Sequence, residues 1–167
     1  MSLKSTGFFS HPDCRKHEMG AGHPECPERL AVIDDHLLYI GLSDVLAQYS
    51  APLAALSSLE LAHSHQHIAS LRGLGDLLMD EIDAGGPTHA QIDPDTSINV
   101  HTWQAALRAA GAAVAATDAV MSGEIANAFC SVRPPGHHAE SDKAMGFCFF
   151  NNVAIAAKYA LDKKKKK

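Results

Sequence analysis

The chain carries two adjacent histidines at the end of the segment RPPGHH, which runs from Arg133 to His138. Pro134 and Pro135 stiffen the backbone before them, and Gly136 permits a positive φ or the close approach of another group. Two neighbouring imidazoles can divide acid and base work near neutral pH. From this loop alone, both a catalytic pair and a solvated pair without a chemical role stay open.

RPPGHH follows directly on the apolar run ANAFCSV, residues 126–132, which is typical of a short strand. Active sites of open α/β sheets collect at the carboxyl ends of their strands. We therefore expect the two histidines to lie at that end of the sheet.

The hydrophobic pattern predicts strands that alternate with helices. Strands are expected at 6–9, 59–62 and 126–132, and helices at 27–41, 68–82, 103–121 and 152–161, with a turn at 93–96 and a long ordered loop at 10–27. This alternation predicts an α/β protein with a parallel sheet.

The charge distribution argues against a nucleic-acid partner. Five of the 14 Lys and Arg lie at 163–167, so residues 1–162 carry 9 basic and 19 acidic side chains. Phosphate binding needs a basic surface, whereas this balance is compatible with a cationic substrate. No apolar run is long enough to span a membrane, and the N-terminus lacks a secretory core, so we expect a cytoplasmic protein.

The four cysteines lack a close CxxC pairing, which favours reduced thiols. Cys14 with His17, and His23 with Cys26, loosely resemble a zinc knuckle of unusual spacing. The alternative is a loop in which these residues are incidental. A metal-binding role for the 11 histidines is a further hypothesis.

Longer segments point to a known family. RPPGHHAESDKAMGFCFFNNVAIAA resembles the signature of zinc-dependent histone deacetylases and of bacterial deacetylase-like amidohydrolases, including polyamine deacetylases. HPDCRKHEMGAGHPECPERL resembles the first active-site loop of that family, and DPDT with AALRAAGAA resembles its bacterial members. The resemblance implies the N-terminal part of the arginase/deacetylase three-layer fold over residues 1–161, with about three strands of a parallel sheet. Residues 162–167 are expected to be a disordered or artefactual lysine-rich tail.

The resemblance also implies roles for the histidines. His138 matches the general base of the family, and His137 matches the residue that assists it electrostatically or as an acid. The implied reaction is hydrolysis of acetyllysine or of acetylated polyamines, in which zinc polarises the acyl carbonyl and activates water. A histidine takes the proton of that water, and an imidazolium protonates the departing amine.

Four further positions match the substrate site of the family. Gly146 and Phe147 match residues that line the tunnel for the acetylated amine, and Cys148 lies near the acetyl pocket. Arg29 matches an arginine of the internal cavity below the metal. The alternatives are that Arg29 only pairs with a carboxylate and that Phe147 and Cys148 only belong to the core.

The family's zinc ligands are a D-x-H motif on the next strand and a later Asp, and the sequence contains neither. Asp142 and Asp162 lack the D-x-H context, so we assign no metal ligand and expect no catalytic zinc in this chain. The chain alone is therefore expected to be an inactive N-terminal fragment or a degenerate family member.

A shortened sheet would leave the strand at 126–132 without one neighbour. Its exposed hydrogen-bonding groups and apolar faces predict a homo-oligomer formed through that sheet edge. The alternative function is a non-catalytic interaction module.

Overall fold

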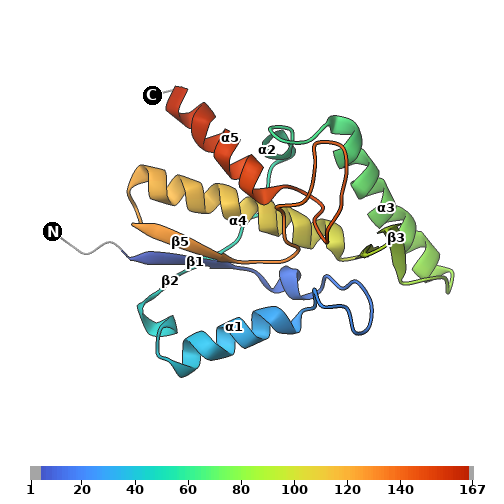
Figure 1. The fold of residues 1–167 in the computed structure, drawn as a ribbon, viewed down its shortest axis with the longest axis horizontal. Coiled ribbons are helices and arrows are strands. Elements are labelled where there is room, and N and C mark those ends of the chain that lie inside the picture. The colour runs from blue at the N-terminus through green and yellow to red at the C-terminus, as the bar shows by residue number, and fades with distance from the viewer. Residues whose placement is uncertain (1–4, 166–167) are drawn as a thin grey trace.

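The computed structural model describes residues 5–165 and places a three-stranded parallel sheet at the centre of the molecule (Figure 1). β1 (Thr6–Ser10) lies between β2 (Ala47–Ser50) and β5 (Asn127–Ser131), so the strand order is β2-β1-β5. The register pairs Phe8 with Gln48 on one side and with Phe129 on the other. The two 3-10 turns are η1 (Pro12–Arg15) and η2 (Ser43–Val45).

Helices lie on both sides of this sheet (Figure 1). α1 (Glu28–Tyr39) covers one face, and α4 (Thr102–Ser122) and α5 (Asn152–Lys165) cover the other. α2 (Leu56–Leu59), α3 (His65–Asp83) and the antiparallel hairpin of β3 (His89–Asp93) and β4 (Thr96–Asn99) extend beyond the carboxyl ends of the strands. The α/β class and the parallel sheet expected from the sequence are confirmed.

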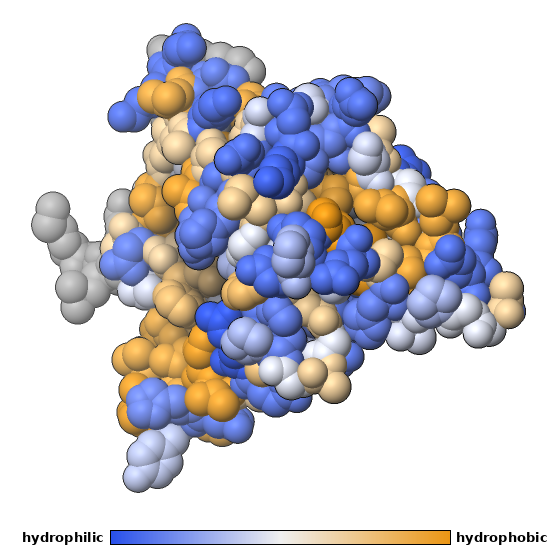
Figure 2. Space-filling view, turned by 45° about the vertical axis from the view of Figure 1, so that its right-hand side comes forward, coloured by the Kyte–Doolittle hydropathy of each residue, from blue (hydrophilic) through white to orange (hydrophobic). Residues whose placement is uncertain are grey.

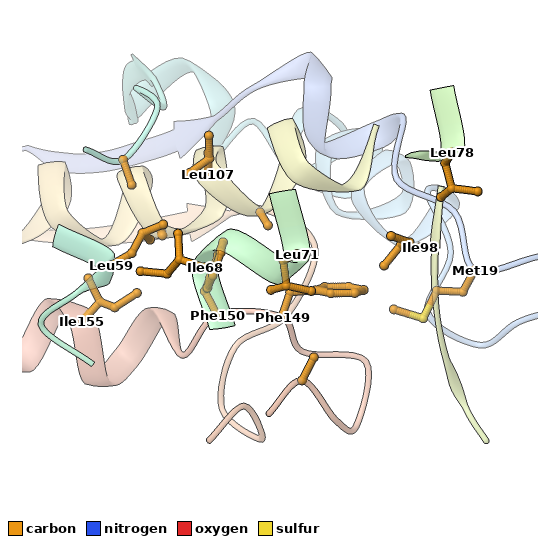
Figure 3. Packing of buried hydrophobic residues seen from close by; sticks show 14 residues of the cluster. Met19, Leu59, Ile68, Leu71, Leu78, Ile98, Leu107, Phe149, Phe150 and Ile155 are labelled. Atoms are coloured by element: carbon orange, nitrogen blue, oxygen red, sulfur yellow. The ribbon is translucent and has the colours of Figure 1, made fainter. Parts of the chain in front are cut away.

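Alanines allow α4 to pack closely on its neighbours. A Cβ atom added to Gly111 in the middle of this helix would lie 2.0 Å from the carbonyl oxygen of Pro52, so the contact requires glycine. The helix ends at Gly123, which adopts a left-handed φ of 77°. In the larger core cluster, Phe149 and Phe150 pack against apolar side chains of α3 and α4 (Figure 3).

One expected strand was wrong. Residues 59–62 continue from α2 as a helical turn, because the carbonyl of Leu59 accepts hydrogen bonds from the amides of Ala62 and His63. Leu59 is fully buried in the core, so a short apolar run was read as a strand although it forms a turn. The second strand is β2, a short half-polar segment that the pattern did not indicate.

The other expected elements are confirmed with small shifts of their ends. The turn at 93–96 is the connection of the β3–β4 hairpin, whose two strands were not expected. The first residues of the segment 162–167 differ from the expected disordered tail, because α5 continues through Lys165 and the Lys163 ammonium contacts Asp118. Residues 166–167 lie outside the described part.

The surface includes exposed apolar side chains at and beyond the end of α1. Leu38, Ile40, Leu42 and Val45 all belong to this group. Figure 2 shows apolar residues at its lower left, at the level where Figure 1 draws α1. Within residues 5–165, no helix has the length and apolar character needed to cross a membrane.

Candidate functional site

A cleft of about 780 Å³ lies at the carboxyl ends of β1 and β5. Its walls come from the loop after β1, the β3–β4 turn and the loop after β5. Five of the six residues singled out in the sequence line it, namely Arg29, His137, His138, Gly146 and Phe147. The topology therefore brings together residues that are more than 100 positions apart in the chain.

The two histidines are exposed side by side in this cleft. Their ring centroids are 4.2 Å apart, and the rings are inclined by 47°. Among residues 5–165, no side chain forms a hydrogen bond with either ring, so both imidazoles are free to contact a bound molecule. This arrangement is compatible with an acid–base pair.

The loop that carries the histidines is anchored by Arg133, which the sequence analysis did not single out. The Arg133 side chain is buried, and its Nε and Nη2 atoms each donate to the Glu25 carboxylate at 2.6 Å. Its Nη1 atom donates to the carbonyls of Cys14 and His17 at 3.0 and 2.9 Å. A buried bidentate pair with these additional bonds fixes the start of RPPGHH against the loop at 10–27.

His17 belongs to the same buried network. Its Nδ1 atom lies 2.8 Å from the Thr102 hydroxyl, and its Nε2 atom lies 3.7 Å from the Glu25 carboxylate without a hydrogen bond. Burial, and then the positive charge of Arg133, lower the pKa of His17 to about 3. His17 is therefore neutral at physiological pH and has a structural position beneath the cleft.

A tight turn from Met145 to Cys148 forms the wall beside the histidines. The two residues exchange both backbone hydrogen bonds at 3.0 Å, and the central residues Gly146 and Phe147 have φ values of 55° and 67°. A Cβ atom on Gly146 would lie 2.8 Å from ring atoms of His138. Glycine is thus required both for the backbone conformation and for the approach of the histidine.

Phe147 is held in its left-handed conformation by polar and aromatic contacts. Its amide donates to the Thr96 hydroxyl at 3.1 Å, and the His23 ring meets the phenyl ring edge-on with centroids 4.7 Å apart. The hairpin and the first loop therefore both support the phenylalanine.

The Cys148 thiol links the turn to the segment that carries His138. Its side chain is buried and its Sγ atom donates to the carbonyl of Gly146 at 3.2 Å, while the His138 amide donates to the sulfur at 3.5 Å. Burial raises the pKa of this thiol. The thiol is neutral and packed behind the turn.

Arg29 lies at the rim of the cleft and does not occupy an enclosed cavity. Its side chain is 55% exposed and pairs with the Glu25 carboxylate at 3.2 Å. The pairing with a carboxylate, which the sequence left open as the alternative, is the arrangement in the structure. The enclosed arginine of this site is Arg133, whose side chain is 2% exposed and bonded to Glu25 and to backbone carbonyls.

Comparison with known proteins identifies the family. Residues 23–167 match the histone deacetylase domain. The chain belongs to the histone deacetylase family. Polyamine deacetylase HDAC10 of Mus musculus is 40% identical over 141 residues, which are 83% of this chain and 20% of that protein. The histone deacetylase-like amidohydrolase of Pseudomonas aeruginosa is 39% identical over 140 residues, which are 84% of this chain and 34% of that protein.

A solved structure supports the same assignment. The HD domain of HDA15 superposes with a TM-score of 0.85 and 30% identity, over 96% of this chain and 44% of that chain. A probable deacetylase of Archaeoglobus fulgidus is 37% identical over 158 residues, and the match spans 93% of this chain and 41% of that protein. This histone deacetylase family chain therefore spans less than half the length of these relatives.

The zinc ion implied by the histone deacetylase resemblance does not fit the part of the chain that the structure describes. No three His, Cys, Asp or Glu side chains in residues 5–165 are grouped so that they could hold a metal ion. The loose zinc-knuckle spacing at 14–26 does not converge either, and the cysteines of this loop, like Cys130 and Cys148, are free. The cleft thus brings together residues to which the family resemblance assigns acid–base and tunnel roles, and the described residues provide no metal-binding group beside them.

Proposed function

We propose that this chain supplies the acid–base half of a deacetylase site that acts on acetylated amines. The observation that carries the proposal is the single cleft shared by His137, His138, Gly146 and Phe147. Membership of the histone deacetylase family supports amide hydrolysis as the reaction class. The four free cysteines are compatible with the cytoplasmic location inferred from the sequence.

The two histidines divide the proton transfers of this reaction. His138 takes a proton from the water that attacks the acyl carbon, and His137 as an imidazolium assists and gives a proton to the departing amine. The turn beside them confines the acetylated arm, because Phe147 and the His138 ring face the same cleft. Acetyllysine and acetylated polyamines both present such an arm, and both belong to the proposed substrate class.

The chain alone is proposed to have no zinc-dependent turnover. A zinc hydrolase needs about three protein ligands and an open position, and the described residues provide no such group. Activity should be assayed with an acetyllysine peptide and an N-acetylated polyamine in the presence of added zinc. Turnover that disappears on addition of a chelator would overturn this part of the proposal.

Ligand binding tests the cleft without requiring turnover. Isothermal titration with N-acetyl-butylamine should give a weak saturable signal that His138→Ala reduces at least about tenfold, which corresponds to about 1.4 kcal/mol. His65→Ala is the matched control, because the His65 side chain is 87% exposed outside the cleft. Equal binding by both variants would contradict the assignment of the cleft.

A second function is supported by the β5 edge, which is the side of β5 opposite β1. In the described part of the chain β5 pairs only with β1, and Phe129 on this strand is 49% exposed. We propose that two copies associate through the β5 edge, as open edges readily pair. Sedimentation at micromolar concentration should show a dimer or larger assembly, and a monomer would exclude this association.

A further inference from the structure

Two buried histidines lie behind the cleft, at the start of α3. His63 is 4% exposed and His67 is 7% exposed, and their ring centroids are 5.1 Å apart. Both rings meet Phe150 edge-on, at 5.4 and 5.9 Å between centroids. Neither ring lines the cleft that contains the tandem histidines.

The partners of His63 determine its tautomer. Its Nε2 atom lies 2.8 Å from the backbone amide of Asn151, which can only donate, so Nε2 must carry a lone pair. Its Nδ1 atom lies 3.3 Å from the carbonyl of Ser141, which can only accept, so Nδ1 must carry the proton. The ring is therefore neutral and satisfied at both nitrogens.

These two partners stand at the two ends of the loop that bears the cleft wall. Asn151 closes the base of the loop by donating from Nδ2 to the carbonyl of Ala139 at 2.9 Å. The turn with Gly146 and Phe147 lies between the ends. His67 holds the same segment, since its Nε2 atom donates to the carbonyl of Phe149 at 2.9 Å.

We propose that His63 is a positioning residue, which in its neutral form holds the Gly146–Phe147 turn in place and on protonation releases it. A protonated Nε2 would direct an N–H group at the N–H group of Asn151, so the 2.8 Å hydrogen bond would be lost. This inference goes beyond the proposed function because it concerns the geometry of the cleft wall and requires no deacetylase chemistry.

The groups around His63 have opposing effects on its pKa. Burial, and then the nearby His67, lower the pKa of His63, and Lys158 on α5 acts in the same direction. The backbone groups of Ser141 and Glu140 raise it. The pKa of Asp142 on the same loop is lowered first by hydrogen bonds with Ser64 and Ser141, and to a smaller extent by His67 and His63. Because the folded pKa is lowered, the stability of the closed loop is present above the ordinary histidine value of about 6.5 and is lost as the pH falls below it.

Hydrogen exchange measured by NMR tests this proposal on the whole chain. The exchange rates of the Asn151 and Phe147 amides, corrected for the intrinsic pH dependence, should rise as the pH falls below about 6.5, by up to about tenfold per pH unit. His63→Gln should remove this step, because glutamine keeps an acceptor for the Asn151 amide but does not titrate.

Two further variants separate a local effect from loss of the fold. His67→Gln keeps a donor for the Phe149 carbonyl and should retain the pH step, and so should His65→Gln at the exposed neighbouring position. Fluorescence of Trp103, whose ring meets Phe150 at 5.9 Å, should follow the same titration. A step that persists in His63→Gln, or no step in the unmodified chain, would overturn the proposal. Since no readout depends on turnover, failure here is distinguishable from failure of the proposed function.

Discussion

The carboxyl end of β5 and the β5 edge are built in opposite ways. At the carboxyl end, all the polar groups of Arg133 are directed to Glu25 and to backbone carbonyls inside the protein. Along the edge, the described structure pairs β5 on one side only and leaves Phe129 49% exposed. The difference indicates that the loop of His137 and His138 is firmly anchored, whereas one border of the same strand has no strand partner in the described part of the chain.

Removal of the buried Arg133 guanidinium should cause the largest loss of stability. Arg133→Met leaves the Glu25 carboxylate buried without its main partner, and we expect a loss of about 3–5 kcal/mol in the free energy of unfolding. Arg29→Met removes a 55% exposed partner of the same carboxylate and should cost at most about 1 kcal/mol. Urea denaturation of both variants measures the difference, and equal losses would contradict the anchoring role of Arg133.

Acid should lower the free energy of unfolding through His17, whose carbonyl accepts a hydrogen bond from Arg133 at the carboxyl end of β5. The folded pKa of His17 is lowered to about 3, so its contribution to stability is present above about 6.5 and is lost as the pH falls toward 3. The expected loss is about 1.4 kcal/mol per pH unit within this window. His17→Asn, which can still bond to Thr102, should flatten the pH dependence of urea denaturation. An unchanged slope would show that His17 does not titrate on unfolding.

Addition of a methyl group at Gly146, in the wall of the cleft, should lower the free energy of unfolding by an intermediate amount. Gly146→Ala combines a positive φ with a contact of 2.8 Å to His138, and we expect a loss of about 1–3 kcal/mol with displacement of the His138 ring. Gly22→Ala is the matched control, because Gly22 also has a positive φ but has no atom within 4 Å of its added Cβ. Thermal unfolding of the two variants separates backbone strain from the contact. If Gly22→Ala lowered the stability as much as Gly146→Ala, the contact with His138 would not contribute to the effect.

A charge placed on the β5 edge should disrupt the proposed dimer. Phe129→Asp places a carboxylate on β5 and should dissociate the proposed dimer in sedimentation, while loss of the stacking of Phe129 on Phe8 lowers the free energy of unfolding of the monomer by about 1–2 kcal/mol. Val32→Asp on the exposed side of α1, where Val32 is 66% exposed, is the control and should leave the dimer intact. Dissociation by the control alone would place the interface on α1.

Local pattern predicted most of the fold and part of the site. The run at 126–132 and the helices could be predicted because their apolar residues recur at the spacing typical of strands and helices. β2 could not, because AQYS is short and gains its strand conformation by pairing with β1. The histidines, Gly146 and Phe147 belong to one continuous segment, RPPGHHAESDKAMGFCFFNNVAIAA, so the family resemblance singled them out together. Glu25 and Arg133 are 108 residues apart, so their contact became visible only in three dimensions.

The most direct test of the account is an NMR titration that observes the histidine side chains and the backbone amides. On addition of N-acetyl-butylamine, shifts should concentrate at His137, His138, Gly146 and Phe147, and unacetylated butylamine should not reproduce them. This result would place an acetylated amine between the acid–base pair and the turn. Shifts that avoid these four residues, or equal shifts with the free amine, would contradict the claim that the cleft is the acid–base half of a deacetylase site.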